Sequence, residues 1–307
     1  MKKFLKIIWG IFAVIGILFV TCFLGYRLTW GRFYISIHQK YVERFDEFVG
    51  LLRSSGPYEK DTTSFEMTLI QDAARAKEIR DYFQLDKLYD ADADTWTKAL
   101  AIGKYVATNI PHANQEIEPE HRNAIDLWKY TKNVEPAFNC RLHSILTFEL
   151  LLAAGLDARF VTCMPGDKYD TDCHVMNEVW LPELSKWAMI DTDMDGNYAS
   201  DLDGTPLSLR EIRERCISGE QMQYHPRFKK ASTKVNEHYA YMAKNTYWFS
   251  CWETLSYYQE DWPNRQREIG RKINLVPSGY KGFDIEEGEI VTTDADSFWA
   301  APVKSCL

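Results

Sequence analysis

Residues 138–163, FNCRLHSILTFELLLAAGLDARFVTC, decide the fold together with two segments that follow them, 173–181 (CHVMNEVWL) and 186–193 (KWAMIDTD). After Cys140, apolar residues recur at steps of three and four, which predicts a helix that begins near this cysteine. Gly155 is expected to end the helix, because glycine accepts the positive φ of a C′ position. Cys140 would then lie at the helix N-terminus, where unpaired N–H groups and the helix dipole favour a thiolate.

Three strands are predicted after this helix. Residues 157–163 are rich in β-branched and aromatic side chains, residues 173–181 alternate with period two, and residues 186–191 follow a turn. His174 opens the second strand and Asp191 closes the third, so in an antiparallel pair both lie at one edge of the sheet. We expect the helix N-terminus to dock at that edge and to bring Cys140 within hydrogen-bond reach of His174.

Cys140, His174 and Asp191 have the chemistry of a thiol-dependent acyl-transfer site. A thiolate attacks, an imidazole accepts and returns the proton, and a carboxylate orients the ring. Each residue alone has a plainer interpretation: a small buried cysteine, a structural strand histidine and a solvated turn aspartate. Their order favours the catalytic interpretation. The Cys140 backbone N–H is expected to hold the oxyanion, with Asn133 or Trp128 as candidates for a second donor.

This pattern resembles the transglutaminase-like superfamily, whose core is related to the papain-like cysteine enzymes. In that family the cysteine starts a helix that ends in a leucine-rich run, followed by glycine, alanine, arginine and an apolar residue. The residues that match this run are Leu151, Leu152, Gly155, Ala158 and Arg159. The family's histidine strand commonly has the pattern H-A-W-x-E-V, matched by His174, Glu178 and Val179, and its aspartate follows a tryptophan, as Asp191 follows Trp187.

Three positions depart from the family pattern. Met176 replaces the usual aromatic residue, Asn139 stands where a glycine often precedes the cysteine, and Asp191 is followed by Thr-Asp in place of Pro-Thr. These departures affect the walls of the pocket and leave the three catalytic residue types in place. The resemblance therefore implies a Cys140–His174–Asp191 triad and a thioester acyl-enzyme formed from a peptide-like amide. Hydrolysis is favoured over cross-linking; the alternative is a non-catalytic peptide-binding or scaffold module on the same fold.

The N-terminal tract 7–26 contains 20 residues without a charge, enough for a helix to cross a bilayer. Lys2, Lys3 and Lys6 precede it, which favours a cytoplasmic N-terminus and an extracytoplasmic globular part. We predict a single-pass anchor of the kind expected for a membrane-anchored, bacterial-type family member. A cleaved signal peptide and a lipoprotein signal ending at Cys22 are the alternatives.

The 307-residue chain has 46% hydrophobic residues and a net charge of −8, which indicates a globular protein and argues against a nucleic-acid partner. The fold class is α+β: N-terminal helices, then a nucleophile helix packed on an antiparallel sheet. Further helices are predicted at 41–54, 70–82, 95–110 with Asp94 or Asp92 as its cap, 124–130, 208–218 and 247–258, and further strands near 273–276 and 289–293. The predicted domains are 1–38 (anchor), 39–225 (transglutaminase-like) and 226–307 (C-terminal extension).

No metal or cofactor is predicted, although the sequence raises three other uses of these residues. Residues 191–197 imitate the start of a calcium loop, but the twelfth position is Leu202 where a bidentate glutamate is required. A zinc site would need Cys140, His143, Cys163 and Cys173, which lack the usual spacing. Cys163 and Cys173 flank one loop, so a disulfide between them is a further hypothesis. The expected partners are a peptide or protein substrate and the membrane.

Overall fold

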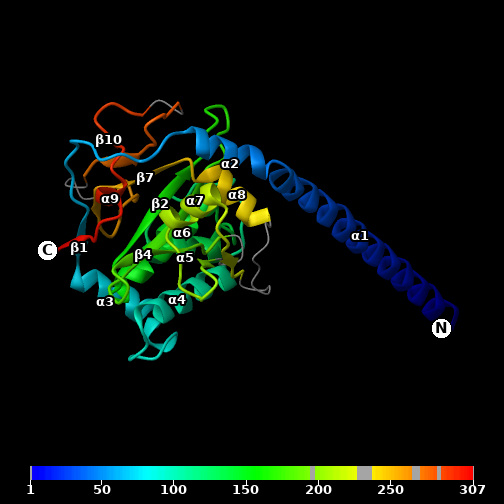
Figure 1. Ribbon diagram of the computed structural model, residues 1–307. Helices are drawn as coiled ribbons and strands as arrows, with labels where there is room; N and C mark the ends of the chain where they lie inside the picture. The colour runs from blue at the N-terminus through cyan, green and yellow to red at the C-terminus, as the bar shows by residue number, and fades with distance from the viewer. Residues whose placement is uncertain (1, 194–197, 227–236, 265–269, 282–284, 307) are drawn as a thin grey trace.

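The structure is a computed structural model that describes residues 2–193, 198–226, 237–264, 270–281 and 285–306 (Figure 1). A mixed α+β body carries one long N-terminal helix. The central element of the body is α6 (Cys140–Ala153), which packs on β2 and β3 of a six-stranded sheet. The predicted fold class is confirmed.

The main sheet has the strand order β10-β9-β7-β2-β3-β4. Its strands are β2 (Ala158–Met164), β3 (His174–Leu181), β4 (Lys186–Ile190), β7 (Trp248–Trp252), β9 (Lys272–Leu275) and β10 (Ile290–Thr292). Neighbours are antiparallel except β9 and β10, which are parallel. The segment after residue 225 therefore contributes β7, β9 and β10 to the same sheet that carries His174.

Two smaller sheets lie beside the main one. Three short strands form a parallel sheet of order β11-β1-β8, and two form an antiparallel ribbon, β5-β6. These strands are β1 (Thr68–Gln71), β5 (Ala199–Ser200), β6 (Gln223–Tyr224), β8 (Thr254–Leu255) and β11 (Val303–Cys306). The parallel sheet joins segments that are distant in the chain, because β1 precedes α3 (Ala73–Phe83) and β11 ends at Cys306.

The sequence sets both ends of α6. The Asn139 side chain accepts a hydrogen bond from the Leu142 N–H at 3.0 Å and so caps the N-terminus. At the other end Gly155 has φ of +79°, the left-handed conformation predicted for it. Ser144 fixes the helix on β3, since its hydroxyl donates to the Val175 carbonyl at 2.8 Å and its carbonyl accepts from Asn177 at 3.0 Å. Cys140 is thereby held at the edge where β3 begins.

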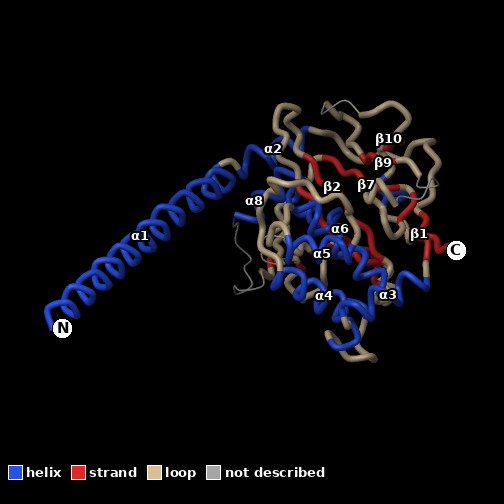
Figure 2. The backbone as a smooth tube through the Cα atoms, turned by 180° about the vertical axis from the view of Figure 1, so that it is seen from behind, coloured by secondary structure: helices blue, strands red, loops and turns tan. Residues whose placement is uncertain are grey.

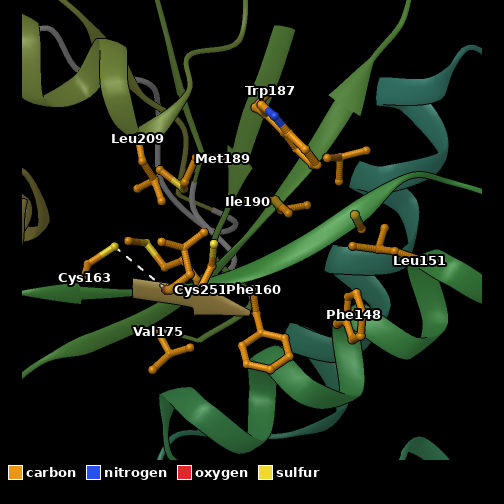
Figure 3. Packing of buried hydrophobic residues seen from close by; sticks show 14 of the residues in the cluster. Phe148, Leu151, Phe160, Cys163, Val175, Trp187, Met189, Ile190, Leu209 and Cys251 are labelled. Atoms are coloured by element: carbon orange, nitrogen blue, oxygen red, sulfur yellow. Dashed lines mark hydrogen bonds between the residues drawn. The ribbon is translucent and has the colours of Figure 1, made fainter. Parts of the chain in front are cut away.

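Helices cover both faces of the sheet around α6. On the α6 side lie α3 (Ala73–Phe83), α4 (Thr95–Asn109) and α5 (Ala124–Asn133), and Asp94 caps α4 as predicted (Figure 2). The other helices are α2 (Phe45–Ser54), η1 (Leu85–Lys87), α7 (Leu209–Ser218), α8 (Glu237–Asn245) and α9 (Ala295–Phe298). Ile190 of β4 faces α4, whereas Met189, the preceding residue, faces Leu209 of α7 (Figure 3). The sheet is thus buried between two helical layers.

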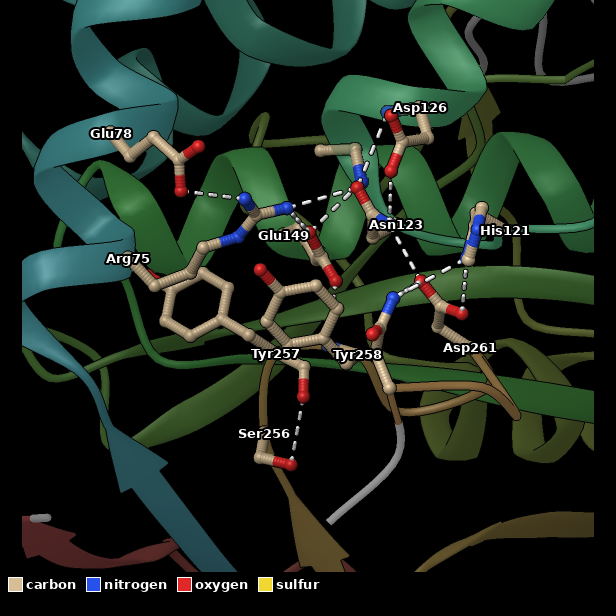
Figure 4. A network of polar contacts seen from close by, with 12 residues as sticks. Arg75, Glu78, His121, Asn123, Asp126, Glu149, Ser256, Tyr257, Tyr258 and Asp261 are labelled. Carbon is tan, nitrogen blue, oxygen red and sulfur yellow. Dashed lines mark hydrogen bonds and ion pairs between the residues drawn. The ribbon is translucent and has the colours of Figure 1, made fainter.

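A buried polar network holds the helices around the middle of α6 (Figure 4). Glu149 is completely buried, and its two carboxylate oxygens accept from the backbone N–H groups of Ala124 at 2.9 Å and Tyr258 at 2.7 Å. Arg75 of α3 lies 3.6 Å from the same carboxylate and also donates to Asn123. Burial raises the pKa of Glu149, although the N–H donors and Arg75 oppose that shift. The network links α3, α5, α6 and the loop after β8.

Two predicted elements differ in the structure. The helix predicted at 247–258 is wrong: this segment forms β7 and β8. The residues of β7, WFSCW, alternate between the two faces of the sheet. The strands that pair with β7 are β2 and β9, which are distant from it in the sequence. Aromatic residues suit such a strand as well as they suit a helix, so pairing decides the outcome. The helix predicted at 70–82 begins only at Ala73, because residues 68–71 form β1.

The hypothesis of a disulfide between Cys163 and Cys173 is also wrong. Both residues are free thiols, and the strand register pairs Cys163 with His174. Cys163 is completely buried in the core, and burial raises the pKa of its thiol. It behaves as a small apolar core residue.

Helix α1 (Lys2–Glu43) projects away from the body in both views (Figures 1 and 2). Its segment Lys6–Gly25 has a mean hydropathy of 2.7 and is entirely uncovered by the rest of the protein. It is therefore long and apolar enough to cross a membrane, and a signal sequence would pass the same test.

Candidate active site

Cys140 is the first residue of α6. The loop before it is held by Gln115, whose side chain accepts from the Asn139 N–H at 3.2 Å and donates to the carbonyl of Ala137 at 2.8 Å. N–H groups in the first turn of a helix have no acceptor within the helix. The sulfur therefore stands beside the positive end of the α6 dipole, with first-turn donors available to a negatively charged oxygen.

His174 and Asp191 form a buried hydrogen-bonded pair. His174 Nε2 lies 2.7 Å from Asp191 Oδ2, and the other carboxylate oxygen accepts from the Asp193 N–H at 3.1 Å. Burial by itself lowers the pKa of His174, but the charge of Asp191, its hydrogen bond and Cys140 outweigh burial and raise that pKa well above its usual value. Because Nε2 is occupied by Asp191, Nδ1 is the nitrogen available to the sulfur.

The three predicted residues thus come together at one sheet edge. Cys140 Sγ, a His174 ring nitrogen and an Asp193 carboxylate oxygen all lie within 4.8 Å of one another, and Asp191 is on the far side of the imidazole. A thiol in this position can pass its proton to an imidazole whose orientation a carboxylate fixes. The arrangement suits nucleophilic attack on a carbonyl carbon.

Asp193 and His112 are two further site residues that the sequence analysis did not assign to catalysis. His112 Nδ1 lies 2.9 Å from each carboxylate oxygen of Asp193. His143, buried one turn along α6, has its Nε2 3.7 Å from the same carboxylate. The sequence does mark Asp193, which stands two residues after Asp191, but this spacing was interpreted as part of a calcium motif. His112 follows Pro111 in a loop, and no sequence pattern marks it as a site residue.

The pKa values of these groups are shifted in different directions. The hydrogen bond that His112 donates to Asp193 raises the pKa of His112, in spite of partial burial, whereas burial lowers the pKa of His143 to about 4. Burial would raise the pKa of Asp193, but the hydrogen bond with His112 and the nearby histidines lower it. At neutral pH His143 is therefore uncharged and Asp193 is ionised.

A cleft of about 580 Å³ opens above Cys140. One wall comes from the end of α1: the Tyr41 hydroxyl donates to Asp172 at 3.0 Å, and the Tyr241 hydroxyl of α8 donates to the same carboxylate at 3.0 Å. The Tyr241 ring in turn packs against His174 with its centroid 5.4 Å from that of the imidazole. The N-terminal helix thus touches the side chains that surround the candidate base.

The sequence also raised a zinc site, a calcium loop and two candidates for a second oxyanion donor. Among the described residues, the group close enough to share a metal ion is Cys140, His174 and Asp193, which has only Cys140 in common with the zinc set. Residues 194–197 of the calcium-like motif lie outside the described residues. Neither Asn133 nor Trp128 is among the described residues that line the cleft, and Trp128 stacks on Tyr105 with a centroid separation of 5.5 Å.

Residues 72–192 match the family model of the transglutaminase-like superfamily, so the chain contains a transglutaminase-like domain, and this segment belongs to that superfamily. The match begins at the cap of α3 and ends one residue after Asp191. It includes all three residues that the sequence resemblance assigned to the triad.

Two solved structures are similar to parts of the chain. A candidate cysteine protease from Cytophaga hutchinsonii is 18% identical over 52% of this chain and 49% of that chain, with a TM-score of 0.32. A candidate protease from Parabacteroides distasonis is 15% identical over 52% of this chain and 29% of that chain, with a TM-score of 0.27. The matched regions thus span about half of the first protein's chain and less than a third of the second's. No curated protein matches the sequence.

Proposed function

We propose that this protein is a cysteine acyl transferase or hydrolase that acts on peptide-like amides. Cys140 is the nucleophile, His174 is general base and then general acid, and Asp191 orients His174. The observation that carries the proposal is the buried 2.7 Å contact between His174 and Asp191 at the sheet edge where Cys140 begins α6. The transglutaminase-like domain supports the same chemical class.

The reaction divides into two steps. The Cys140 thiolate attacks the substrate carbonyl, and the oxyanion is held by the Cys140 backbone N–H. His174 then gives the proton taken from the thiol to the leaving amine, which departs and leaves a thioester. In the second step His174 takes a proton from water, and the hydroxide attacks the thioester and releases the acid. The sulfur returns as thiolate and His174 keeps the proton.

Hydrolysis is proposed in preference to cross-linking. Water is always available to the thioester, whereas cross-linking requires a dedicated site for a second amine. The competing proposal is a non-catalytic peptide-binding or scaffold module on the same fold. The two proposals differ in one property of Cys140, because a binding module needs no reactive thiolate.

The experiment that tests the proposal is thiol profiling of the protein after deletion of residues 1–38. Iodoacetamide labelling of Cys140 is followed by peptide mass spectrometry from pH 5 to 9, with glutathione in the same buffer as the free-thiol reference. An ordinary cysteine ionises near pH ~8.5, and we expect Cys140 to react well below that pH. The Cys140→Ser variant is the control for peptide assignment. Labelling of Cys140 at neutral pH no faster than a free thiol would remove the catalytic proposal.

We further propose that α1 anchors the body to a membrane, with the body on the extracytoplasmic side. The support is the apolar segment Lys6–Gly25 and the basic residues that precede it. Full-length protein with a C-terminal tag should sediment with membranes and resist carbonate extraction, and deletion of residues 1–38 should release a soluble protein. Recovery of a soluble form shortened by about 25 residues would mean that a signal peptidase cleaves the tract.

A further inference from the structure

A second histidine–aspartate pair, His112 and Asp193, lies beside Cys140 and His174. His112 contacts both oxygens of Asp193 at 2.9 Å, and an Asp193 oxygen is within 4.8 Å of the Cys140 sulfur. Asp193 is only 2% exposed, whereas the His112 side chain is 52% exposed and lines the cleft. The pair therefore joins a buried charge near the sulfur to a solvent-accessible imidazole.

The charge on Asp193 creates an electrostatic problem for the proposed nucleophile. Two negative groups close together disfavour each other's charged forms, most strongly where water is excluded. An unpaired Asp193 carboxylate would oppose the Cys140 thiolate on which the proposed function depends. A cation in contact with Asp193 would cancel that opposition.

Among the described residues near Asp193, few groups can supply the cation. His143 stays neutral because burial lowers its pKa to about 4, and the charge of His174 is shared with Asp191. His112 is the group whose hydrogen bonds reach both Asp193 oxygens. The other titratable or charged side chains that line the cleft are Tyr41, Glu118, Arg122, Arg141, Asp172, Cys173 and Tyr241. Behind the cleft lining, His238 Nε2 lies 3.6 Å from Asp191 Oδ2.

We propose that protonated His112 is a positioning residue for the reaction: it neutralises Asp193 and so permits the Cys140 thiolate to form. The inference rests on the proposed function, since it concerns the same thiol. In this proposal the charge of Asp193 opposes the thiolate unless His112 is protonated. The reactivity of Cys140 then depends on a histidine that acts through its hydrogen bonds with Asp193.

The pH dependence follows from the contacts. The hydrogen bond with Asp193 raises the pKa of His112, so the cation is present below that pKa and is lost as the pH rises through it. The gain in thiolate on raising the pH is therefore partly offset once His112 becomes neutral. A lysine at position 112 would keep its charge through this range.

The test compares the rate of Cys140 alkylation by iodoacetamide from pH 5.5 to 8 in five proteins. These are the wild type and the variants His112→Gln, His112→Lys, Asp193→Asn and the double variant His112→Gln/Asp193→Asn. We expect His112→Gln to slow labelling at pH 6.5 by about tenfold, the effect of one pKa unit. His112→Lys should label at least as fast as the wild type, and the double variant should recover to within about twofold of Asp193→Asn.

Recovery in the double variant separates an electrostatic role from a structural one. A structural role predicts that the second substitution leaves labelling as slow or makes it slower, and that result would overturn the inference. Equal rates in the wild type and His112→Gln would overturn it as well. Melting temperatures of all five proteins exclude unfolded samples, and His112→Lys carries the test if His112→Gln does not fold. If wild-type Cys140 labels no faster than a free thiol, the proposed function fails, whereas the relative rates of the variants still decide the inference.

Discussion

Helix α6 carries a buried carboxylate at its middle and borders two buried carboxylates at its N-terminus, and the two regions treat these charges differently. In the middle, the oxygens of Glu149 accept from two backbone N–H groups, and Arg75 supplies the opposite charge. At the N-terminus, the partners of Asp191 and Asp193 are the imidazoles of His174 and His112. Backbone N–H groups and arginine do not titrate in the working range of a protein, and histidine does.

This difference predicts that the network around Glu149 affects stability and that the cluster near Cys140 affects reactivity. The Glu149 network is saturated with fixed donors and joins three helices and a loop, so its loss should act on stability. The cluster near Cys140 places two titratable histidine–aspartate pairs beside a thiol. Its loss should act on reactivity.

The largest expected effect is that of Asp191→Asn on activity. The amide would face His174 Nε2 with a donor in place of an acceptor, and so favour the wrong tautomer of the ring; the comparable change in a serine triad costs about 10⁴ in rate. The side chains match in size, so we expect little change in melting temperature. Thioester formation with any substrate that the wild type turns over measures the effect, and an unchanged rate would make Asp191 a turn residue.

The second prediction concerns Glu149→Gln. The amide would turn a donor toward a backbone N–H and leave Arg75 without its buried anion, and removal of one partner from a buried pair costs about 3–5 kcal/mol. In a domain of this size that corresponds to a fall in melting temperature of roughly 10 °C. The labelling rate of Cys140 per folded molecule should stay at the wild-type level.

Glu78→Gln is the matched control, because Glu78 contacts the same arginine at 2.7 Å but is exposed. Exposed ion pairs contribute little, so its melting temperature should stay within about 2 °C of the wild type. Equal losses for Glu78→Gln and Glu149→Gln would show that the network does not depend on the buried carboxylate.

The smallest effect is expected from His143, and it depends on pH. Burial lowers its folded pKa to about 4 from 6.5, so the unfolded chain binds the proton first and stability falls as the pH drops from about 6.5 towards 4. At pH 4.5 this contribution is about 2 to 3 kcal/mol. His143→Leu should therefore lose less unfolding free energy than the wild type between pH 7 and 4.5, as measured by urea denaturation.

His225→Leu provides the comparison for His143. Burial also lowers the pKa of His225, but this residue is only partly buried, so its substitution should change the acid dependence less. If the two variants and the wild type lose the same free energy on acidification, the cost of holding His143 neutral is not a property of the site.

The local sequence was sufficient for the ends of the central elements. Asn139, Asp94 and Ser208 cap the helices that begin after them, because a short polar side chain satisfies N–H groups of its own first turn. Alternation within β3 and the turn before β4 bring His174 and Asp191 to one edge. The pairing of these two residues was predictable because they are only 17 positions apart on adjacent strands.

The tertiary structure decided the contacts between distant segments. His112 and Asp193 are 81 positions apart, and Arg75 reaches a carboxylate on another helix; no local pattern marks either contact. Residues 248–252 form β7 because β2 and β9 are there to accept their backbone hydrogen bonds. The sequence by itself indicated the residues to which we assign the chemistry, since caps, turns and alternation act over a few positions. Only packing determined which charges surround the thiol, because a buried charge is set by whatever the rest of the chain brings against it.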